Sequence, residues 1–315
     1  MLRRSFLQAS LALPLAAAAC ARPSDPTVLN VASQKGGTKS LMTSAGVLAG
    51  APYRIEWSEF PAAQHLLEAV SAGAADLGGV GDAPFLFAFA SSGRVRAVHA
   101  SRSLGRGAST AILVKKISPA RSIADLRGKR FATGRGSIGH YLLLYRLREA
   151  GLKPEDVTIS FLTPADAKAA FSTGAIDAWS TWNSYIYLAA RDDDARVLTD
   201  GRGALSGIGF QAANINSIET KRPLIADFLM RLSRAQRWSI NHKDAYAAAL
   251  AKETGMDKDI ALQTAETGRG QPAPIDESVI AEESQVLATF RDAGVIASAP
   301  DIRQAFDASF NSAAI

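Results

Sequence analysis

The chain has 315 residues, of which 47% are hydrophobic and 21% charged, with 25 glycines and a formal net charge of +5. These values are typical of a folded globular protein and exclude a collagen-like chain and most disordered sequences. The single cysteine excludes an intramolecular disulfide, and the length predicts about two domains, each large enough for its own core.

Residues 1–20 have the pattern of an export signal. Arg3 and Arg4 precede an apolar run, 11–19, that is too short to span a bilayer and ends in alanines. The paired arginines are typical of twin-arginine signals, which predicts export to a bacterial periplasm. Cys20 follows Ala17, Ala18 and Ala19, as in the lipid-acceptor site of bacterial lipoproteins, so lipidation at Cys20 and simple cleavage both stay open. Loss of the segment lowers the net charge from +5 to +3, because it carries two arginines and no acid.

The rest of the chain contains an internal repeat. Residues 31–37 resemble 131–137, and 69–76 resemble 170–177, at offsets of 100 and 101 residues. The first pair has an apolar strand end, a glycine loop and a helix start in common. Similar segments in one order at nearly one offset predict two α/β units in tandem.

Each unit is expected to run strand, glycine loop, helix, strand, helix, strand. The strands are predicted at 27–33, 53–57 and 75–80 in the first unit and at 129–133, 157–162 and 175–179 in the second. Alternating strands and helices predict mostly parallel sheets with right-handed crossovers. Two more strands, 111–114 and 209–213, are candidate crossings between lobes. Helices predicted at 223–251, 257–267, 276–294 and 300–310 are expected to return and cover the first lobe.

The loop at 134–140 is the strongest candidate for a binding site. It follows a predicted parallel strand at its carboxyl end, where ligand sites form in such sheets, and it opens a helix. Unpaired backbone N–H groups and the helix dipole at Ser137–His140 favour an anion. The alternative is that the glycines only make a tight turn and Ser137 only caps the helix.

Residue patterns for cofactors and catalysis are missing. The loop matches G-x-G-x-x-G, but the next predicted strand ends in Thr163-Pro164 rather than the acid that dinucleotide binding needs. The four histidines have no metal-ligand spacing, and Ser137 lacks the glycine of a nucleophile elbow. Basic residues are scattered among acids, which argues against nucleic acid as a partner. We therefore expect no cofactor and no enzymatic activity.

Three segments resemble one protein family, namely residues 81–84, 136–140 and 163–185. They are similar to the aliphatic-sulfonate-binding proteins of bacterial ABC importers, which belong with nitrate-, taurine- and thiamine-precursor-binding proteins. The similarity runs from about residue 28 to 308 and is densest between 129 and 186. The family often has Asp-Pro where this chain has Asn183-Ser184.

The resemblance implies an α/β, two-lobed periplasmic binding protein fold (type II) with two crossovers. Each lobe is then a mixed, mostly parallel sheet flanked by helices, with a cleft between the lobes. The expected division is 1–26 signal peptide and linker, 27–112 plus 214–315 lobe I, and 113–213 lobe II.

The implied function is to capture an aliphatic sulfonate in the cleft and deliver it to an ABC permease in the inner membrane. The alternatives are taurine, nitrate, a sulfate ester or a thiamine pyrimidine precursor as the ligand, or an exported enzyme on the same fold.

Within that cleft, the anionic head group is predicted to lie near Ser137, Gly139 and His140, facing Gln34 of the other lobe. Asp82 is expected to cap the helix that follows Gly81 and to orient its N–H groups rather than touch the anion.

Two tryptophans are candidates for contact with the ligand tail. Trp179 and Trp182 are expected to flank it, and Thr181 to add a polar contact. Core packing is the alternative for both tryptophans. The alternation along a strand puts Trp179 and Thr181 on one face, so Trp182 is expected to point differently.

Overall fold

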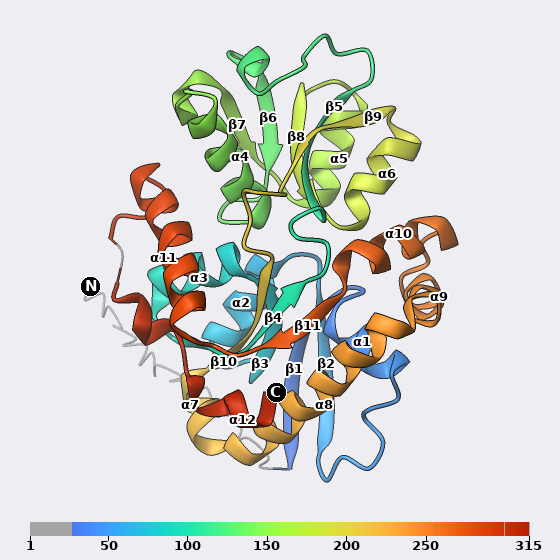
Figure 1. Cartoon of the computed structure of the whole chain (residues 1–315), viewed down its shortest axis with the longest axis vertical. Coiled ribbons are helices and arrows are strands. Elements are labelled where there is room, and N and C mark those ends of the chain that lie inside the picture. The colour runs from blue at the N-terminus through green and yellow to red at the C-terminus, as the bar shows by residue number, and fades with distance from the viewer. Residues whose placement is uncertain (1–26, 299, 315) are drawn as a thin grey trace, which may run out of the picture.

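Two mixed β-sheets, each flanked by helices, form the two lobes that lie one above the other in Figure 1. The structure is a computed structural model and describes residues 27–298 and 300–314. The predicted export signal and Cys20 lie outside these residues. The architecture confirms the expected two-lobed α/β fold.

The larger lobe contains a six-stranded sheet of order β11-β4-β10-β3-β1-β2. Its strands are β1 (Val28–Gln34), β2 (Arg54–Phe60), β3 (Leu77–Gly81), β4 (Val95–Ser103), β10 (Ile208–Asn214) and β11 (Gly270–Ala273). β1 is parallel to β2 and β3, whereas β10 is antiparallel to both β3 and β4, and β11 is antiparallel to β4.

The smaller lobe repeats this plan in a five-stranded sheet of order β7-β6-β8-β5-β9. Its strands are β5 (Thr110–Lys115), β6 (Arg130–Thr133), β7 (Thr158–Phe161), β8 (Ala178–Trp182) and β9 (Ala195–Asp200). β6 is parallel to β7 and β8, and β5 is antiparallel to β8. The order matches β2-β1-β3-β10-β4 of the larger lobe strand for strand, which confirms the tandem repeat.

Helices cover both faces of each sheet. They are α1 (Thr38–Ser44), α2 (Ala63–Ser71), α3 (Asp82–Ser92), α4 (Ile138–Glu149), α5 (Pro164–Ser172), α6 (Ser184–Asp192), α7 (Ile215–Thr220), α8 (Arg222–Asn241), α9 (Lys243–Thr254), α10 (Lys258–Gly268), α11 (Glu277–Asp292) and α12 (Asn311–Ala314). Short 3₁₀ turns lie at Ala124–Leu126, Pro154–Asp156, Ile302–Ala305 and Ala308–Phe310. Within the described part of the chain, none of the helices has the length and apolar character needed to traverse a bilayer.

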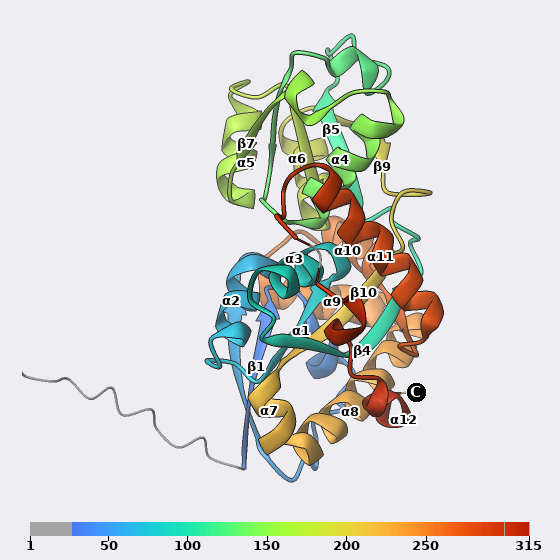
Figure 2. The same ribbon diagram turned by 90° about the vertical axis from the view of Figure 1, so that its left-hand side faces the viewer.

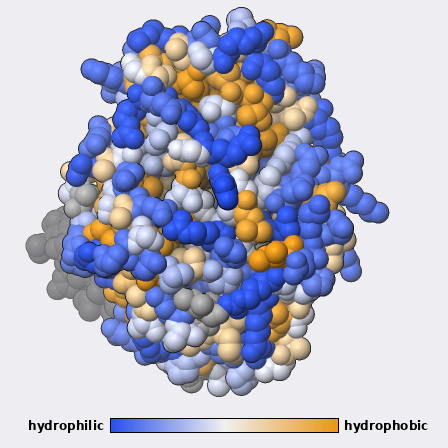
Figure 3. Space-filling view, viewed as in Figure 1, coloured by the Kyte–Doolittle hydropathy of each residue, from blue (hydrophilic) through white to orange (hydrophobic). Residues whose placement is uncertain are grey.

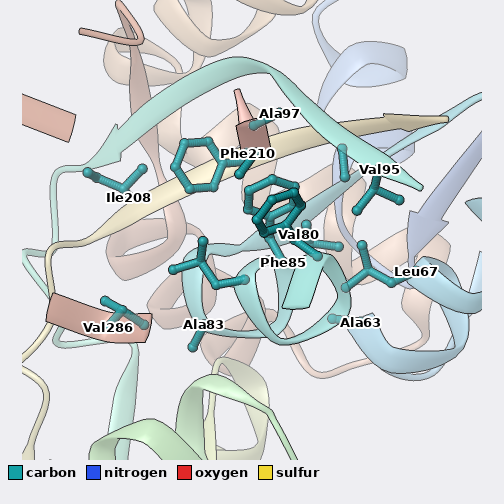
Figure 4. Close-up of a cluster of buried hydrophobic side chains, with 14 of the residues drawn as sticks. Ala63, Leu67, Val80, Ala83, Phe85, Val95, Ala97, Ile208, Phe210 and Val286 are labelled. Carbon is teal, nitrogen blue, oxygen red and sulfur yellow. The ribbon is translucent and has the colours of Figure 1, made fainter. Parts of the chain in front are cut away.

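The core of the larger lobe explains why the C-terminal helices return to it. On one sheet face Phe85 of α3 packs against Phe210 of β10, with ring centroids 5.2 Å apart (Figure 4). α11 adds Val286 to this cluster. On the other face Phe228 and Leu232 of α8 pack in the cluster that contains the β1 side chains. The prediction that these helices cover the first lobe is confirmed.

Several predicted elements differ from the observed ones. The helix expected at 223–251 is broken at His242, whose φ of −123° and ψ of 41° separate α8 from α9. The segment 300–310 forms two 3₁₀ turns instead of a helix. β4, β9 and β11 were not predicted, because polar residues interrupt their apolar pattern.

The chain passes between the lobes twice, at 104–109 and at 201–207. The boundaries expected after residues 112 and 213 fall inside β5 and β10, which belong to different sheets. We propose to place the lobe boundaries in the two crossing segments instead.

Candidate functional site

A cavity of about 290 Å³ lies between the lobes. Its walls come from strand ends, the starts of α2 and α3 and parts of α8, α9 and α10 in the larger lobe, and from β5, α4 and the end of β8 in the smaller one. On the face shown in Figure 3, hydrophilic residues of both lobes meet across their junction. The lining is Gln34, Leu41, Ala62, Ala63, Gln64, Val80, Gly81, Asp82, Pro84, Ser101, Ser103, Gly107, Ser109, Thr110, Ser137, Ile138, Trp182, Asn183, Leu205, Gly207, Ile208, Gly209, Gln236, Ser239, Tyr246, Gly268, Arg269 and Gly270.

Three helix N-termini reach this cavity. Its walls include Ala62, Gly81 and Ser137, the residues that precede α2, α3 and α4. α2, α3 and α4 follow the parallel strands β2, β3 and β6, so the fold itself directs their first turns to one edge of each sheet. First-turn N–H groups have no partner within their helix and carry the positive end of its dipole.

Ser137 is both the N-cap of α4 and part of the cavity wall. Its Oγ accepts a hydrogen bond from the His140 N–H at 3.1 Å and lies 3.4 Å from Thr133 Oγ1, so the Ser137 hydroxyl proton is available to a ligand when Thr133 is the donor of that pair. The preceding Gly136 has φ of +66°, a conformation that favours glycine. The Gly136 N–H donates to His140 Nδ1 at 3.1 Å and so fixes the loop.

Gly139 and His140 lie behind the wall rather than on it. A Cβ at Gly139 would lie 2.7 Å from the Ser180 carbonyl oxygen, so this glycine lets α4 approach β8. His140 is buried, and burial together with the nearby Arg135 lowers its pKa to about 4. The neutral imidazole of His140 accepts the Gly136 N–H and so positions the loop that carries Ser137, but it does not line the cavity.

Asp82 occupies the first turn of α3. Its carboxylate accepts hydrogen bonds from the Ala83 N–H and the Ser206 Oγ, each at 2.6 Å. Burial raises the pKa of Asp82 to about 6. Because this carboxylate already offsets the dipole of α3, the helix N-termini still free to attract an anion are those of α2 and α4, from opposite lobes.

The tryptophans differ in position. Trp179 is 1% exposed and packs between Phe171 and Tyr185, with ring centroids 6.1 and 5.8 Å away. Thr181, on the same strand face, is fully buried, and its Oγ1 has no hydrogen-bond partner among the described residues. Trp182 points differently and lines the cavity.

The structure therefore brings Gln34, Asp82, Ser137 and Trp182 together on the cavity wall. It does not bring Gly139, His140, Trp179 and Thr181 to the wall. For the latter group, close helix–strand packing and core burial account for their positions.

Sequence reasoning missed several lining residues, among them Gln64, Asn183, Gln236, Tyr246 and Arg269. The position of Asn183 could have been predicted, because it follows the carboxyl end of β8, where ligand sites are expected in such sheets. The residues of α8–α10 had none, because only the tertiary return of those helices brings them to the cavity.

Charge is sparse at the site. Asp82 and Arg269 are the charged residues of the lining as far as the structure describes it. Across residues 27–298 and 300–314 no cluster of three or more His, Cys, Asp or Glu side chains has the geometry of a metal site.

Contacts between the lobes surround the cavity. The Gln64 Nε2 donates to the Arg135 carbonyl oxygen, and Tyr187 of α6 lies 3.0 Å from the Thr267 hydroxyl of α10. α11 rises from the larger lobe toward α4 (Figure 2), and its Phe290 packs 5.9 Å from the Tyr141 ring. These contacts bring the two walls together.

Known proteins resemble this chain over most of its length. Residues 53–208 match a family model described as "ABC transporter, phosphonate, periplasmic substrate-binding protein". An aliphatic sulfonates-binding protein of Escherichia coli (strain K12) is 33% identical over 307 residues, 96% of each chain. The structure of the alkanesulfonate-binding protein SsuA from Xanthomonas axonopodis pv. citri bound to MOPS superposes with a TM-score of 0.82 at 30% identity, covering 90% of this chain and 99% of that one. The desulfurization enzyme DSZB, 18% identical with a TM-score of 0.67 over 91% and 98% of the chains, shares the fold.

Proposed function

The chain belongs to the aliphatic-sulfonate-binding family of periplasmic substrate-binding proteins, and from this premise we propose that it captures an aliphatic sulfonate for an ABC importer. The observation that carries the proposal is the pair of free helix N-termini, α2 and α4, that face one cavity from opposite lobes. Each N-terminus carries about half a positive elementary charge, so the pair matches one monoanion.

The sulfonate head is placed between these two helix starts. Backbone N–H groups at Ala63 and Gln64 of α2 and at Ile138 of α4 are first-turn donors, and the Ser137 hydroxyl adds another. Gln34, also on the wall, donates only a long hydrogen bond of 3.4 Å to the Gly79 carbonyl, so its amide is available to the ligand. A sulfonate is charged at every physiological pH, so binding needs neither metal nor proton transfer.

The tail is placed against the apolar part of the lining. Trp182 and Ile138 of the smaller lobe and Leu41 and Leu205 line the same cavity. Burying methylene groups there contributes roughly 0.8 kcal/mol each. This contribution favours alkanesulfonates over nitrate and sulfate, which have no tail.

Capture couples to delivery through the two lobes. An anion held by α2 and α4 together binds the closed form better than an open one, where the two helices separate. The closed form is then the surface that a membrane permease recognises. Residues 1–20 fit this role as an export signal to the periplasm, with Cys20 as a site of lipidation or cleavage.

A transport role is favoured over catalysis. The sole cysteine is Cys20, in the predicted signal, so no thiol nucleophile comes from the rest of the sequence. The neutral, buried His140 does not line the cavity. We infer a carrier that releases its ligand unchanged.

Titration calorimetry on the purified chain without residues 1–26 tests the function. The panel is ethane-, butane- and octanesulfonate, taurine, nitrate and sulfate, with each ligand followed by NMR for turnover. We expect micromolar binding of at least one alkanesulfonate, weaker binding of nitrate and sulfate, and unchanged ligand. Binding of nitrate or sulfate alone, or consumption of a sulfonate, would overturn the proposal.

A further inference from the structure

The cavity wall has a second polar end, on elements other than α3 and α4. This end is formed by Gln236 and Ser239 of α8, Tyr246 of α9 and residues 268–270, where α10 ends and β11 begins. Figure 1 shows α3 and α4 on the left of the junction between the lobes and α10 on its right. A ligand held at α4 therefore extends its tail toward a wall built from the C-terminal helices.

Arg269 supplies a cation at this end. Its Nη1 donates to the Ile240 carbonyl oxygen at 2.8 Å, while its Nε is shielded from solvent and has no hydrogen-bond partner in the described structure. Among the described residues Arg269 has no ion pair with a carboxylate, and no other cation lines the cavity. The C-terminus of α8, which includes Ile240, offsets only about half of one charge.

Gln236, one turn before Ile240 on α8, adds an amide to the same end of the cavity wall. Burial lowers the pKa of His99 to about 4, so its imidazole is neutral, and His99 Nε2 lies 3.0 Å from Gln236 Oε1. With its proton on Nε2, His99 donates to that oxygen, and the Gln236 amide nitrogen keeps its N–H groups for the cavity.

We infer that Arg269 and Gln236 form a subsite for a carboxylate, so that the preferred ligand is a sulfonate with a carboxylate at the far end of its chain. The inference rests on the proposed function, because α2 and α4 must hold the sulfonate first. A guanidinium binds a carboxylate through paired N–H donors, and such charge-assisted hydrogen bonds are stronger than those to a neutral hydroxyl. The carboxylate of the ligand would pair with Arg269, a cation that no acid of the described residues neutralises.

Matched ligand pairs test the subsite in the wild-type chain. Ethane-, propane- and butanesulfonate are compared by calorimetry with sulfoacetate, 3-sulfopropanoate and 4-sulfobutanoate, so that each series covers a range of chain lengths. We expect the carboxylated ligand of the best length to bind about tenfold to a hundredfold more tightly than the alkanesulfonate with the same number of carbon atoms.

Variants of Arg269 test whether this residue causes the preference for carboxylated sulfonates. Arg269→Met should abolish the preference for the carboxylate and leave the affinity for the plain alkanesulfonate within about twofold. Arg102→Met is the matched control, since Arg102 lies nearby on β4, pairs with Glu282 at 2.7 Å and does not line the cavity. It should keep the preference. Arg269→Gln, which retains a donor for Ile240, replaces the Met variant if thermal unfolding shows that the latter is not folded.

The outcomes separate the two proposals. If plain sulfonates bind but wild type shows no preference for a carboxylate, or Arg269→Met keeps that preference, the carboxylate subsite is refuted and the proposed function stands. If no sulfonate of either series binds, the proposed function fails and the subsite falls with it.

Discussion

Replacing Ser137 with aspartate separates binding from folding. Ser137 Oγ caps α4 by accepting the His140 N–H at 3.1 Å, and aspartate is as good an N-cap as serine. A carboxylate at this position also interacts well with the positive end of the α4 dipole. The Ser137→Asp variant should therefore stay folded, with a loss in the free energy of unfolding of about 1 kcal/mol, the usual size for a point mutation, although the side chain is only 5% exposed.

Its effect on the ligand is large. The substitution removes a hydrogen bond from the Ser137 hydroxyl to a charged group, about 1.5–3 kcal/mol. Two like charges at about 4 Å add roughly 4 kcal/mol of repulsion at the effective dielectric constant of a protein surface. The sum corresponds to a loss of more than about a thousandfold in affinity.

Calorimetry with the tightest-binding alkanesulfonate and urea unfolding of the same samples measure both quantities. Ser137→Asn is the matched control: it keeps a capping oxygen without the charge and should bind far better than the aspartate variant. Ligand affinity of Ser137→Asp within tenfold of wild type would show that the anion does not lie at the start of α4.

Two further substitutions test the closure of the lobes and the buried carboxylate. Gly136 has φ of +66°, and a Cβ there would lie 2.6 Å from the Phe87 ring of the other lobe, so Gly136→Ala should weaken ligand binding at least tenfold in calorimetry. Gly174→Ala is the control: its φ of +74° gives the same backbone strain, but no atom lies within 4 Å of the new Cβ, so this variant should bind the ligand normally. Burial raises the pKa of Asp82 from 3.8 to about 6, so the folded protein holds this proton more tightly than the unfolded chain does. The free energy of unfolding should therefore fall by about 3 kcal/mol as the pH rises from below 3.8 to above 6. Urea unfolding between pH 4 and 7 should show a shallower fall for Asp82→Asn, and identical pH profiles for variant and wild type would contradict this assignment.

The parts of the fold that sequence predicts are those with local signals. Thr163 and Pro164 predict the start of α5, and the Thr163 Oγ1 accepts the Asp166 N–H at 3.3 Å as an N-cap does. The repeat predicts two equivalent sheets because each unit has its own strand–loop–helix pattern. β11 escapes prediction because its four residues, which include Pro272, become a strand only by pairing with β4.

The same distinction applies to the site. Ser137 is predictable because capping and the glycine loop are encoded within a few residues. Trp179 and Trp182 are not separable by residue type, since strand alternation shows that they point differently but not which one faces the cavity. Arg269 reaches the cavity only because α8 to α10 fold back onto the larger lobe, which no local pattern specifies.

The polar contacts between the lobes contribute little to holding the protein closed, whereas Phe290 of α11 and Tyr141 of α4 add apolar packing. The ion pair of Arg191 and Asp257 is exposed, with side chains 46% and 69% accessible, and such pairs contribute about 0–1 kcal/mol. The hydrogen bonds from Gln64 to Arg135 and between Tyr187 and Thr267 add about 1 kcal/mol each. Shifting a two-state equilibrium from 1:99 to 99:1 takes about 5.5 kcal/mol of differential affinity, and micromolar binding amounts to about 8 kcal/mol in total. An anion shared by α2 and α4 supplies such a difference, because an open form presents it with only one of the two helices.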